Sequence, residues 1–157
     1  MSVYRKILVP VDGSPTSSRG LLEAIKLGKD QGATLRLVHV LDELIPGSGA
    51  EAMVYLDTTV DMLRDTGKRL VADAEKLVQD AGLGAESVVL EILGGRAAES
   101  IVAEASRWGA DLIVLGTHGR RGARRLVMGS DAEEIVRTAA MPVLLVRSEA
   151  GAHTSRS

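Results

Sequence analysis

Five short, mostly apolar runs recur along the chain, separated by segments with the spacing of amphipathic helices. The runs cover residues 6–11, 34–41, 87–93, 111–115 and 142–147. Apolar runs without polar–apolar alternation are typical of strands buried on both faces, and such strands belong to parallel sheets whose crossover connections are helices. The alternation of the two patterns therefore predicts an α/β fold, a doubly wound, Rossmann-like parallel sheet with helices on both faces.

Helical spacing is clearest in four segments, residues 16–31, 60–81, 96–108 and 131–140. In each of them apolar residues recur three and four positions apart, which predicts one buried face. The residues expected to face inward are Leu21, Leu22, Ala24, Ile25 and Leu27, then Val60, Leu63, Gly67, Leu70, Ala74, Leu77 and Ala81, then Ala97, Ala98, Ile101, Ala105 and Trp108, and last Ala132, Ile135, Val136 and Ala139. Residues 42–57 show no period of either kind, and a connection of that length indicates a functional lid or a disordered segment.

The 157 residues suffice for one domain with a sizeable core, here residues 1–147, and the polar residues 148–157 are expected to form a disordered tail. A formal net charge of −2 gives the chain as a whole no electrostatic attraction for nucleic acid. The absence of cysteine excludes disulfides and thiolate chemistry. No apolar run approaches the ~20 residues of a membrane span and no signal peptide is visible, so the sequence predicts a cytoplasmic protein without membrane contact.

Glycines punctuate the segment between the run 111–115 and the last helix, in the pattern Gly116-x2-Gly119-x9-Gly129-Ser130. Glycine lets a backbone approach a ligand closely, and helix N-termini offer N–H groups to phosphate, so this segment has the character of an anion cradle. Tight-turn geometry alone also requires glycine, and Ser130 as a helix N-cap would need no ligand. The local residues leave both interpretations open.

Two better-known phosphate-binding fingerprints are excluded. No Gly-Lys-Ser or Gly-Lys-Thr occurs, so the segment is not a P-loop. The spacing of Gly116, Gly119 and Gly122 is not that of the dinucleotide-binding fingerprint.

A second turn of small residues, Asp12-Gly13-Ser14, follows the first run. In open parallel sheets the ligand crevice lies at the carboxyl ends of the strands, where the strand order reverses. If the first and fourth strands are neighbours, this turn and the glycine-rich segment flank one crevice. Asp12 would then bond a ribose hydroxyl or, through a metal ion, phosphate oxygens; the alternative is a turn residue that caps the next helix.

Taken together, these features resemble the universal stress protein family, in its ATP-binding branch. The residues that carry the resemblance are Lys6-Ile7-Leu8-Val9-Pro10-Val11-Asp12-Gly13-Ser14, His39-Val40, Ala110-Asp111-Leu112-Ile113-Val114-Leu115-Gly116, Gly119, Gly129-Ser130 and Met141-Pro142-Val143-Leu144-Leu145-Val146. They span nearly the whole chain in the order of the family.

The resemblance implies a five-stranded sheet in the order 3-2-1-4-5 with ATP across the switch point. It implies that the backbone of Val40 meets the adenine, and that Asp12 serves the ribose. The remaining implied cofactor-binding residues are Pro10 and Val11 near the base, Ser14, Gly116, Thr117 and Gly119 along ribose and phosphates, and Gly129 and Ser130 at the phosphates. Mg²⁺ would accompany the nucleotide, with Asp12 as its one candidate contact, and two copies of the chain would pair through residues 143–147 into a homodimer.

One residue departs from the family pattern. Asp131 follows Gly129-Ser130, where the family often has a small or apolar residue. A carboxylate favours the helix dipole but repels phosphate, so Arg120 and Arg121, together with Arg124 and Arg125, or Mg²⁺, would have to offset it. The arginines are alternatively a solvated surface; no aromatic residue is interleaved with them as single-stranded nucleic-acid binding would favour.

The leading hypothesis is a nucleotide-binding stress-response or signalling module with slow ATP hydrolysis at most and no dedicated catalytic residue. An adenylate-forming or ATP-hydrolysing enzyme of similar fold is the alternative, yet Asp12-Gly13-Ser14-Pro15 is not the motif such enzymes use. A phospho-receiver domain is set aside because Gly94, and not an aspartate, ends the third run. A dimeric interaction protein that needs no nucleotide remains a further alternative, with an unknown protein partner. His118 is expected to be an exposed polar residue, and His39 a core histidine with a satisfied ring.

Overall fold

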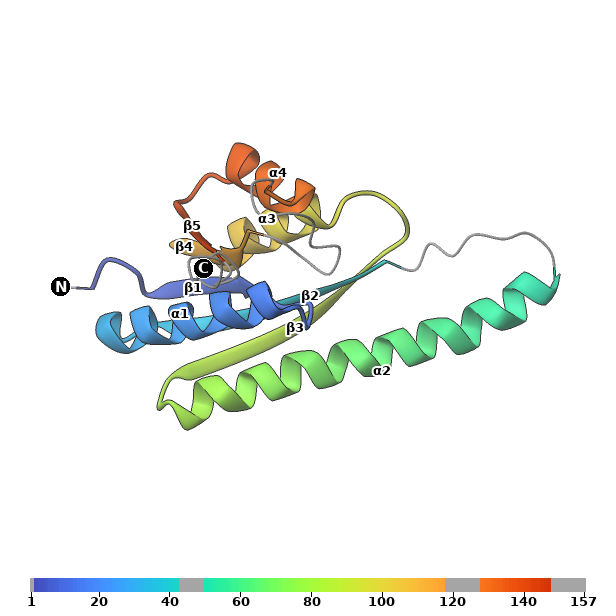
Figure 1. Cartoon of the computed structure of the whole chain (residues 1–157), viewed down its shortest axis with the longest axis horizontal. Helices are drawn as coiled ribbons and strands as arrows, with labels where there is room; N and C mark the ends of the chain where they lie inside the picture. The colour runs from blue at the N-terminus through green and yellow to red at the C-terminus, as the bar shows by residue number, and fades with distance from the viewer. Residues whose placement is uncertain (1, 43–49, 118–127, 148–157) are drawn as a thin grey trace, which may run out of the picture.

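The structure is a computed structural model that describes residues 2–42, 50–117 and 128–147 (Figure 1), with the backbone alone described over 50–57. Its centre is a sheet of five parallel strands: β1 (Lys6–Pro10), β2 (Thr34–Asp42), β3 (Gly84–Ile92), β4 (Leu112–Gly116) and β5 (Val143–Val146). Their order in the sheet is β3-β2-β1-β4-β5, which confirms the expected order.

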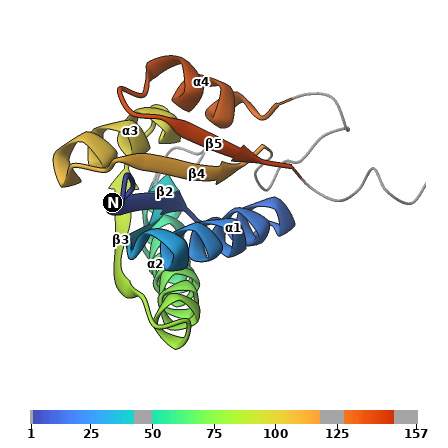
Figure 2. The same cartoon turned by 90° about the vertical axis from the view of Figure 1, so that its left-hand side faces the viewer.

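Four helices connect the strands: α1 (Pro15–Gln31), α2 (Ala50–Asp80), α3 (Ala97–Trp108) and α4 (Ser130–Thr138). α1 and α2 cover one face of the sheet and α3 and α4 the other (Figure 2). Successive residues of β1 supply the two cores, because side chains alternate across a strand: Ile7 and Val9 pack with α1 and α2, and Leu8 packs with α3. The doubly wound architecture is therefore confirmed.

The structure extends two elements beyond their predicted bounds. α2 begins at Ala50, where no period was visible before Val60, and β3 begins at Gly84 instead of residue 87. Residues 50–57 are mostly good helix formers whose apolar members follow one another without a helical period, so periodicity alone missed them. The early start of β3 is set by β2, since Gly84 pairs with Thr34 and the two strands stay in register to their last residues.

Three residues expected on buried helix faces are exposed. They are Leu22 at 52%, Leu77 at 51% and Val136 at 45%. Each adjoins a buried neighbour on its helix, as Leu22 adjoins Leu21 and Val136 adjoins Ile135. A helix laid on a sheet buries a stripe narrower than the full run of apolar positions, so residues on the flank of the stripe stay in water.

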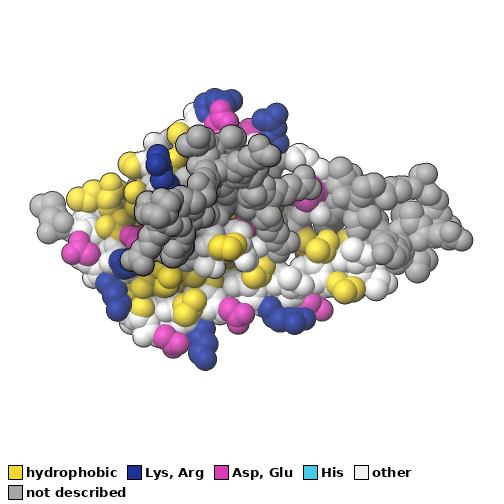
Figure 3. Space-filling model, in the orientation of Figure 1, with side chains coloured by type: hydrophobic (Ala, Val, Ile, Leu, Met, Phe, Trp, Pro, Cys, Tyr) yellow, Lys and Arg dark blue, Asp and Glu magenta, His cyan; other side chains and the backbone are white. Residues whose placement is uncertain are grey.

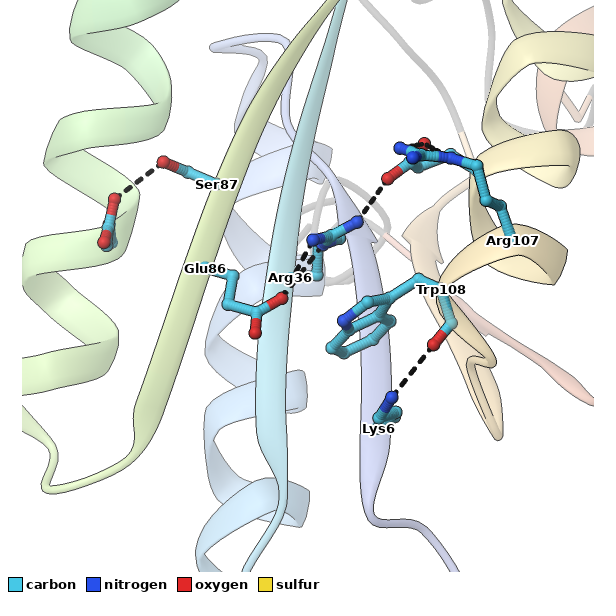
Figure 4. Close-up of polar contacts among 8 residues, drawn as sticks. Lys6, Arg36, Glu86, Ser87, Arg107 and Trp108 are labelled. Atoms are coloured by element: carbon cyan, nitrogen blue, oxygen red, sulfur yellow. Dashed lines mark hydrogen bonds and ion pairs between the residues drawn. The ribbon is translucent and has the colours of Figure 1, made fainter.

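A charged cluster joins α3 to β2 at the amino ends of the strands (Figure 4). Glu104 is buried, and its carboxylate binds the guanidinium groups of Arg36 and Arg107. Arg36 and Lys6 lie over the ring of Trp108, 5.1 and 5.2 Å from its centroid. Trp108, expected to face inward, is half-buried and serves as the platform for these two cations.

Side-chain contacts also attach α2 to β3, the strand at one edge of the sheet. The hydroxyl of Ser87 donates to the carboxylate of Glu75 at 2.6 Å (Figure 4), and Arg64 pairs with Glu91. Basic and acidic side chains are interspersed along the edge of the molecule formed by α2 (Figure 3). In the described part of the chain no helix has the length and hydropathy that crossing a bilayer requires.

Candidate functional site

The strand order reverses between β1 and β4, which lie side by side in the sheet. The chain leaves β1 for α1 on one face and leaves β4 toward α4 on the other. Connections that diverge in this way leave a crevice at the carboxyl ends of the two strands, the usual ligand position in open α/β sheets. The Asp12 turn and the glycine-rich segment both begin at this edge, as the sequence predicted.

The turn after β1 is held by its own side chains. A carboxylate oxygen of Asp12 accepts the main-chain N–H of Ser14 at 2.8 Å, and the hydroxyl of Ser14 caps α1 by accepting the N–H of Ser17 at 3.2 Å. The main-chain N–H of Asp12 in turn donates to the hydroxyl oxygen of Ser17 at 3.1 Å. Asp12 is therefore a turn residue, as one of its two interpretations had it, but Ser14 and not Asp12 caps α1. The hydrogen bond to Ser14 holds the half-buried Asp12 carboxylate at the carboxyl end of β1.

Gly13 completes this turn with a positive φ of 82°. A Cβ atom there would lie 3.1 Å from a methyl group of Leu70 on α2. The turn is thus fixed between α1 and α2.

Gly116 at the end of β4 has a packing role that the sequence did not reveal. A Cβ atom on Gly116 would lie 2.6 Å from the carbonyl oxygen of Thr16, so the strand contacts the first turn of α1 directly. Gly20, one turn further along α1, faces the same strand, and its Cβ would lie 3.2 Å from the nitrogen of Gly116. A glycine in the middle of a predicted helix was the available signal, because such a residue costs stability unless close packing needs it.

Two main-chain hydrogen bonds bring the halves of the glycine motif together. The N–H of Thr117 donates to the carbonyl of Val146 at 3.0 Å, and the N–H of Gly129 donates to the carbonyl of Thr117 at 2.7 Å. Gly116 and Thr117 therefore lie beside Gly129 and the start of α4. The predicted site residues Gly119, Arg120 and Arg121, together with His118, Gly122, Arg124 and Arg125, lie outside the described residues.

α4 begins at Ser130, with Gly129 as its N-cap and no side-chain cap. The interpretation of Ser130 as the N-cap is wrong, because Ser130 already belongs to the first turn of the helix. The first intrahelical bond runs from the N–H of Glu133 to the carbonyl of Gly129 at 2.9 Å. The N–H groups of residues 130–132 precede that bond and have no acceptor within the helix, while the exposed Asp131 adds a negative charge beside them.

The opposite side of the crevice is formed by the end of β2. The ladder between β1 and β2 ends with the N–H of Val11, which donates to the carbonyl of Val38 at 2.8 Å. Main-chain groups alternate in direction along a strand, so the N–H and C=O of Val40 point to the same side as those of Val38, beyond the end of β1. The structure thus brings Pro10, Val11 and the main chain of Val40 to the same edge as Asp12.

His39 is a buried core histidine, as predicted, and one of its two ring nitrogens is hydrogen-bonded. The Nδ1 atom lies 2.8 Å from the carbonyl oxygen of Val11, and 6% of the surface of His39 is exposed to solvent. The other edge of the ring contacts Gly67 of α2, where a Cβ atom would lie 2.8 Å from Cδ2. The sequence placed Gly67 on the inner face of α2 but gave no reason for a glycine there; the contact with His39 supplies it.

With this geometry in place, comparisons with known proteins identify the family. The profile of the "Universal stress protein family" matches residues 3–147. The chain belongs to the universal stress protein family. It is 32% identical over 146 residues to Universal stress protein MJ0531 of Methanocaldococcus jannaschii, covering 93% of this chain and 84% of that protein.

Solved structures of universal stress proteins share the fold. The Lactobacillus plantarum protein UspA superposes with a TM-score of 0.82 at 24% identity, covering 94% of this chain and 100% of its own. A family member from Burkholderia pseudomallei is 33% identical with a TM-score of 0.73, covering 94% and 99%. More distant structures of this fold, 18–23% identical, are complexes with AMP (Arabidopsis thaliana), dAMP (Archaeoglobus fulgidus) and cAMP.

Proposed function

We propose that this universal stress protein binds an adenine nucleotide in the crevice between β1 and β4, with ATP as the working ligand and slow hydrolysis at most. The observation that carries the proposal is the hydrogen bond from Gly129 to Thr117, which sets the uncapped N-terminus of α4 beside the end of β4. Uncapped helix N-termini favour phosphate. The AMP, dAMP and cAMP complexes of relatives support the same ligand class.

Each part of the nucleotide has a matching surface in this proposal. The base lies against the main chain of Val40, with Pro10 and Val11 beside it. The ribose lies at the Asp12 turn with Ser14. The phosphates lie along the motif and the start of α4, contacting Gly116, Thr117, Gly119, Arg120, Arg121, Gly129 and Ser130, with Asp131 as the nearest opposing charge. The N–H of Gly129 already binds Thr117, so phosphate would be met by N–H groups of residues 130–132 and by the hydroxyl of Ser130.

Mg²⁺ would be bound together with the phosphates. Within residues 2–42, 50–117 and 128–147, no three His, Asp or Glu side chains gather into a cluster that holds a metal ion. A cation would therefore take most of its ligands from phosphate and water, with the Asp12 carboxylate as the protein's contribution. It would also reduce the repulsion between Asp131 and the phosphates.

We propose that two copies of the chain pair through residues 143–147, which are β5 and Arg147 after it. β3 and β5 are the two edges of the sheet, and they differ in charge. β3 carries Glu86 and Glu91, whereas β5 has no charged residue and exposes 40% of Leu144. Charges protect an edge strand from pairing, so the uncharged β5 edge is the one suited to a symmetric partner.

As a member of a stress-protein family, the chain would act in a cytoplasmic response as a module whose nucleotide state or protein partner carries the signal. The competing function is a dimeric interaction protein that needs no nucleotide. The retained glycines and Ser130 favour the nucleotide-binding function.

The deciding experiment is thermal unfolding of nucleotide-free protein with Mg²⁺ and excess AMP, ADP or ATP. A ligand at one hundred times its Kd adds about 2.7 kcal/mol, which for this chain length raises Tm by on the order of 5–10 °C. A larger rise with ATP than with AMP supports the phosphate site at α4. Equal rises restrict the site to adenosine, and no rise with any of the three overturns the proposal in favour of the nucleotide-independent interaction protein.

A further inference from the structure

Pairing between β1 and β2 stops at a defined main-chain group. In a parallel ladder, each residue that faces the partner strand donates its N–H to one residue and accepts an N–H from the residue two positions further on. Val11 makes the first of these bonds, to the carbonyl of Val38 at 2.8 Å. The second would run from the N–H of Val40 to the carbonyl of Val11, yet the paired register ends at Pro10 and Val38.

The imidazole of His39 takes the acceptor that Val40 would otherwise use. Its Nδ1 lies 2.8 Å from the carbonyl oxygen of Val11. A carbonyl oxygen only accepts, so Nδ1 carries the proton and His39 is the donor. A side chain of β2 thus replaces the next main-chain donor of the same strand.

The ring is held in place from its other side as well. Gly67 of α2 lies against it, so that a Cβ atom there would be 2.8 Å from Cδ2 and 3.3 Å from Nε2. Val89, the register partner of His39 on β3, borders the same space, since its Cγ1 would be 3.6 Å from that Cβ. The imidazole is therefore confined between the Val11 carbonyl and the backbone of α2.

We propose that His39 is a positioning residue of the nucleotide site, which by occupying the Val11 carbonyl keeps the N–H and C=O of Val40 available for the base. This inference rests on the proposed function. A base edge that offers both an acceptor and a donor, as adenine does, matches a strand's N–H and C=O. Without the His39 donor, the ladder would extend by one bond from Val40 to Val11, and the base would lose its main-chain donor.

The experiment compares two substitutions of similar size, His39→Asn and His39→Leu. An asparagine amide places a donor close to the position of Nδ1, whereas leucine has none. AMP is the probe, measured by calorimetric titration. His39→Asn is expected to keep AMP affinity within about threefold, and His39→Leu to lose tenfold or more.

Hydrogen exchange of the Val40 amide in ligand-free protein gives a readout that simple destabilisation would not move. The Val40 amide is expected to exchange fast, relative to global unfolding, in the wild type and in His39→Asn, and to become protected in His39→Leu. If His39 has only a structural role, the Val40 amide will be unprotected in the wild type and in both variants. If His39→Leu binds AMP as tightly as the wild type, the positioning role is overturned while the proposed function stands.

If the wild type binds none of AMP, ADP and ATP, the proposed function is overturned, and protection of Val40 in His39→Leu alone would still establish the ladder role of His39. Gly67→Ala tests the role without altering His39, because the added methyl displaces the ring from its far side. It is expected to weaken AMP binding, and Tm is measured alongside, because the methyl group overpacks a buried ring while alanine favours a helix interior over glycine. Lys68→Ala, at the exposed neighbouring position, is the control and should bind AMP as the wild type does; equal binding by Gly67→Ala would count against the role.

Discussion

Gly116 of β4 and Thr16 of α1 are in direct main-chain contact, so close that a Cβ atom on Gly116 would lie 2.6 Å from the Thr16 carbonyl oxygen. This contact brings the first turn of α1 to the end of β4. The first glycine of the motif is therefore required by the fold, whatever it also contributes to a ligand. The roles of the motif glycines can be separated by mutation.

Gly116→Ala is expected to destabilise the ligand-free protein. The methyl group meets backbone and not a flexible side-chain end, and overpacking of this kind typically costs about 1–3 kcal/mol. Urea unfolding without nucleotide measures the change. Gly20→Ala is the comparison, with a looser contact of 3.2 Å and a gain in helix propensity, and its loss should be clearly smaller. If Gly116→Ala is as stable as the wild type, the close contact between β4 and α1 is not needed for stability.

Gly119→Val is expected to abolish nucleotide binding and to leave urea unfolding unchanged. The proposal places Gly119 against ribose and phosphate, where a branched side chain would occupy the ligand's space. AMP and ATP titrations measure the binding. Undiminished affinity in this variant would remove Gly119 from the site.

Asp131→Ala is expected to tighten ATP binding by about two- to fivefold at low salt and AMP binding by less, because the carboxylate opposes the phosphate charge and salt screens that effect. Glu133→Ala, also exposed in the first turn of α4, is the matched control and should change ATP affinity less. Titrations at two salt concentrations give the comparison. An ATP affinity lowered by Asp131→Ala would indicate that Asp131 holds Mg²⁺ instead of repelling phosphate.

Glu104→Ala is expected to destabilise the protein by about 1–3 kcal/mol, because Arg36, whose side chain is 21% exposed, loses its buried partner and is left with the exposed Glu86. The Glu104 side chain is 3% exposed and binds both Arg36 and Arg107. Glu133→Ala breaks the exposed pair with Arg137 and should cost less than about 0.5 kcal/mol. Equal effects of the two variants in urea unfolding would show that the Glu104 cluster adds nothing beyond a surface ion pair.

Leu144→Arg is expected to convert the proposed dimer to a monomer, since it places a charge in the middle of the edge strand proposed to pair. Sedimentation velocity measures the oligomeric state. Leu77→Arg, at a comparably exposed leucine on α2, should leave it unchanged. A dimer that survives Leu144→Arg would have to use another surface, and a monomeric wild type would refute the pairing.

The sequence by itself determined the class of fold, the family and the edge of the sheet where the proposed ligand site lies. Burial on one or both faces leaves a local periodic trace, so the five strands and the cores of the four helices could be found from residue patterns alone. The Asp12 turn and the Gly116-to-Ser130 motif were visible for the same reason, because turn and helix-start chemistry depends on residues a few positions apart. Periodicity missed the start of α2, where apolar residues run together without a helical period, and the start of β3, and it assigned three exposed flank residues to buried helix faces.

Tertiary structure alone decided the roles that depend on residues distant in sequence. Gly116 of β4 leaves no room for a side chain because it contacts α1, and Gly20 of α1 faces β4 in the same contact. Gly67 of α2 leaves no room because the ring of His39 lies against it. The link between His39 and the Val11 carbonyl, and the link from Gly129 to Thr117, each join elements that only the assembled sheet places together. A close approach of two backbones or a shared acceptor leaves no local pattern, because its partners are selected by the packing of the whole sheet and not by their neighbours in the chain.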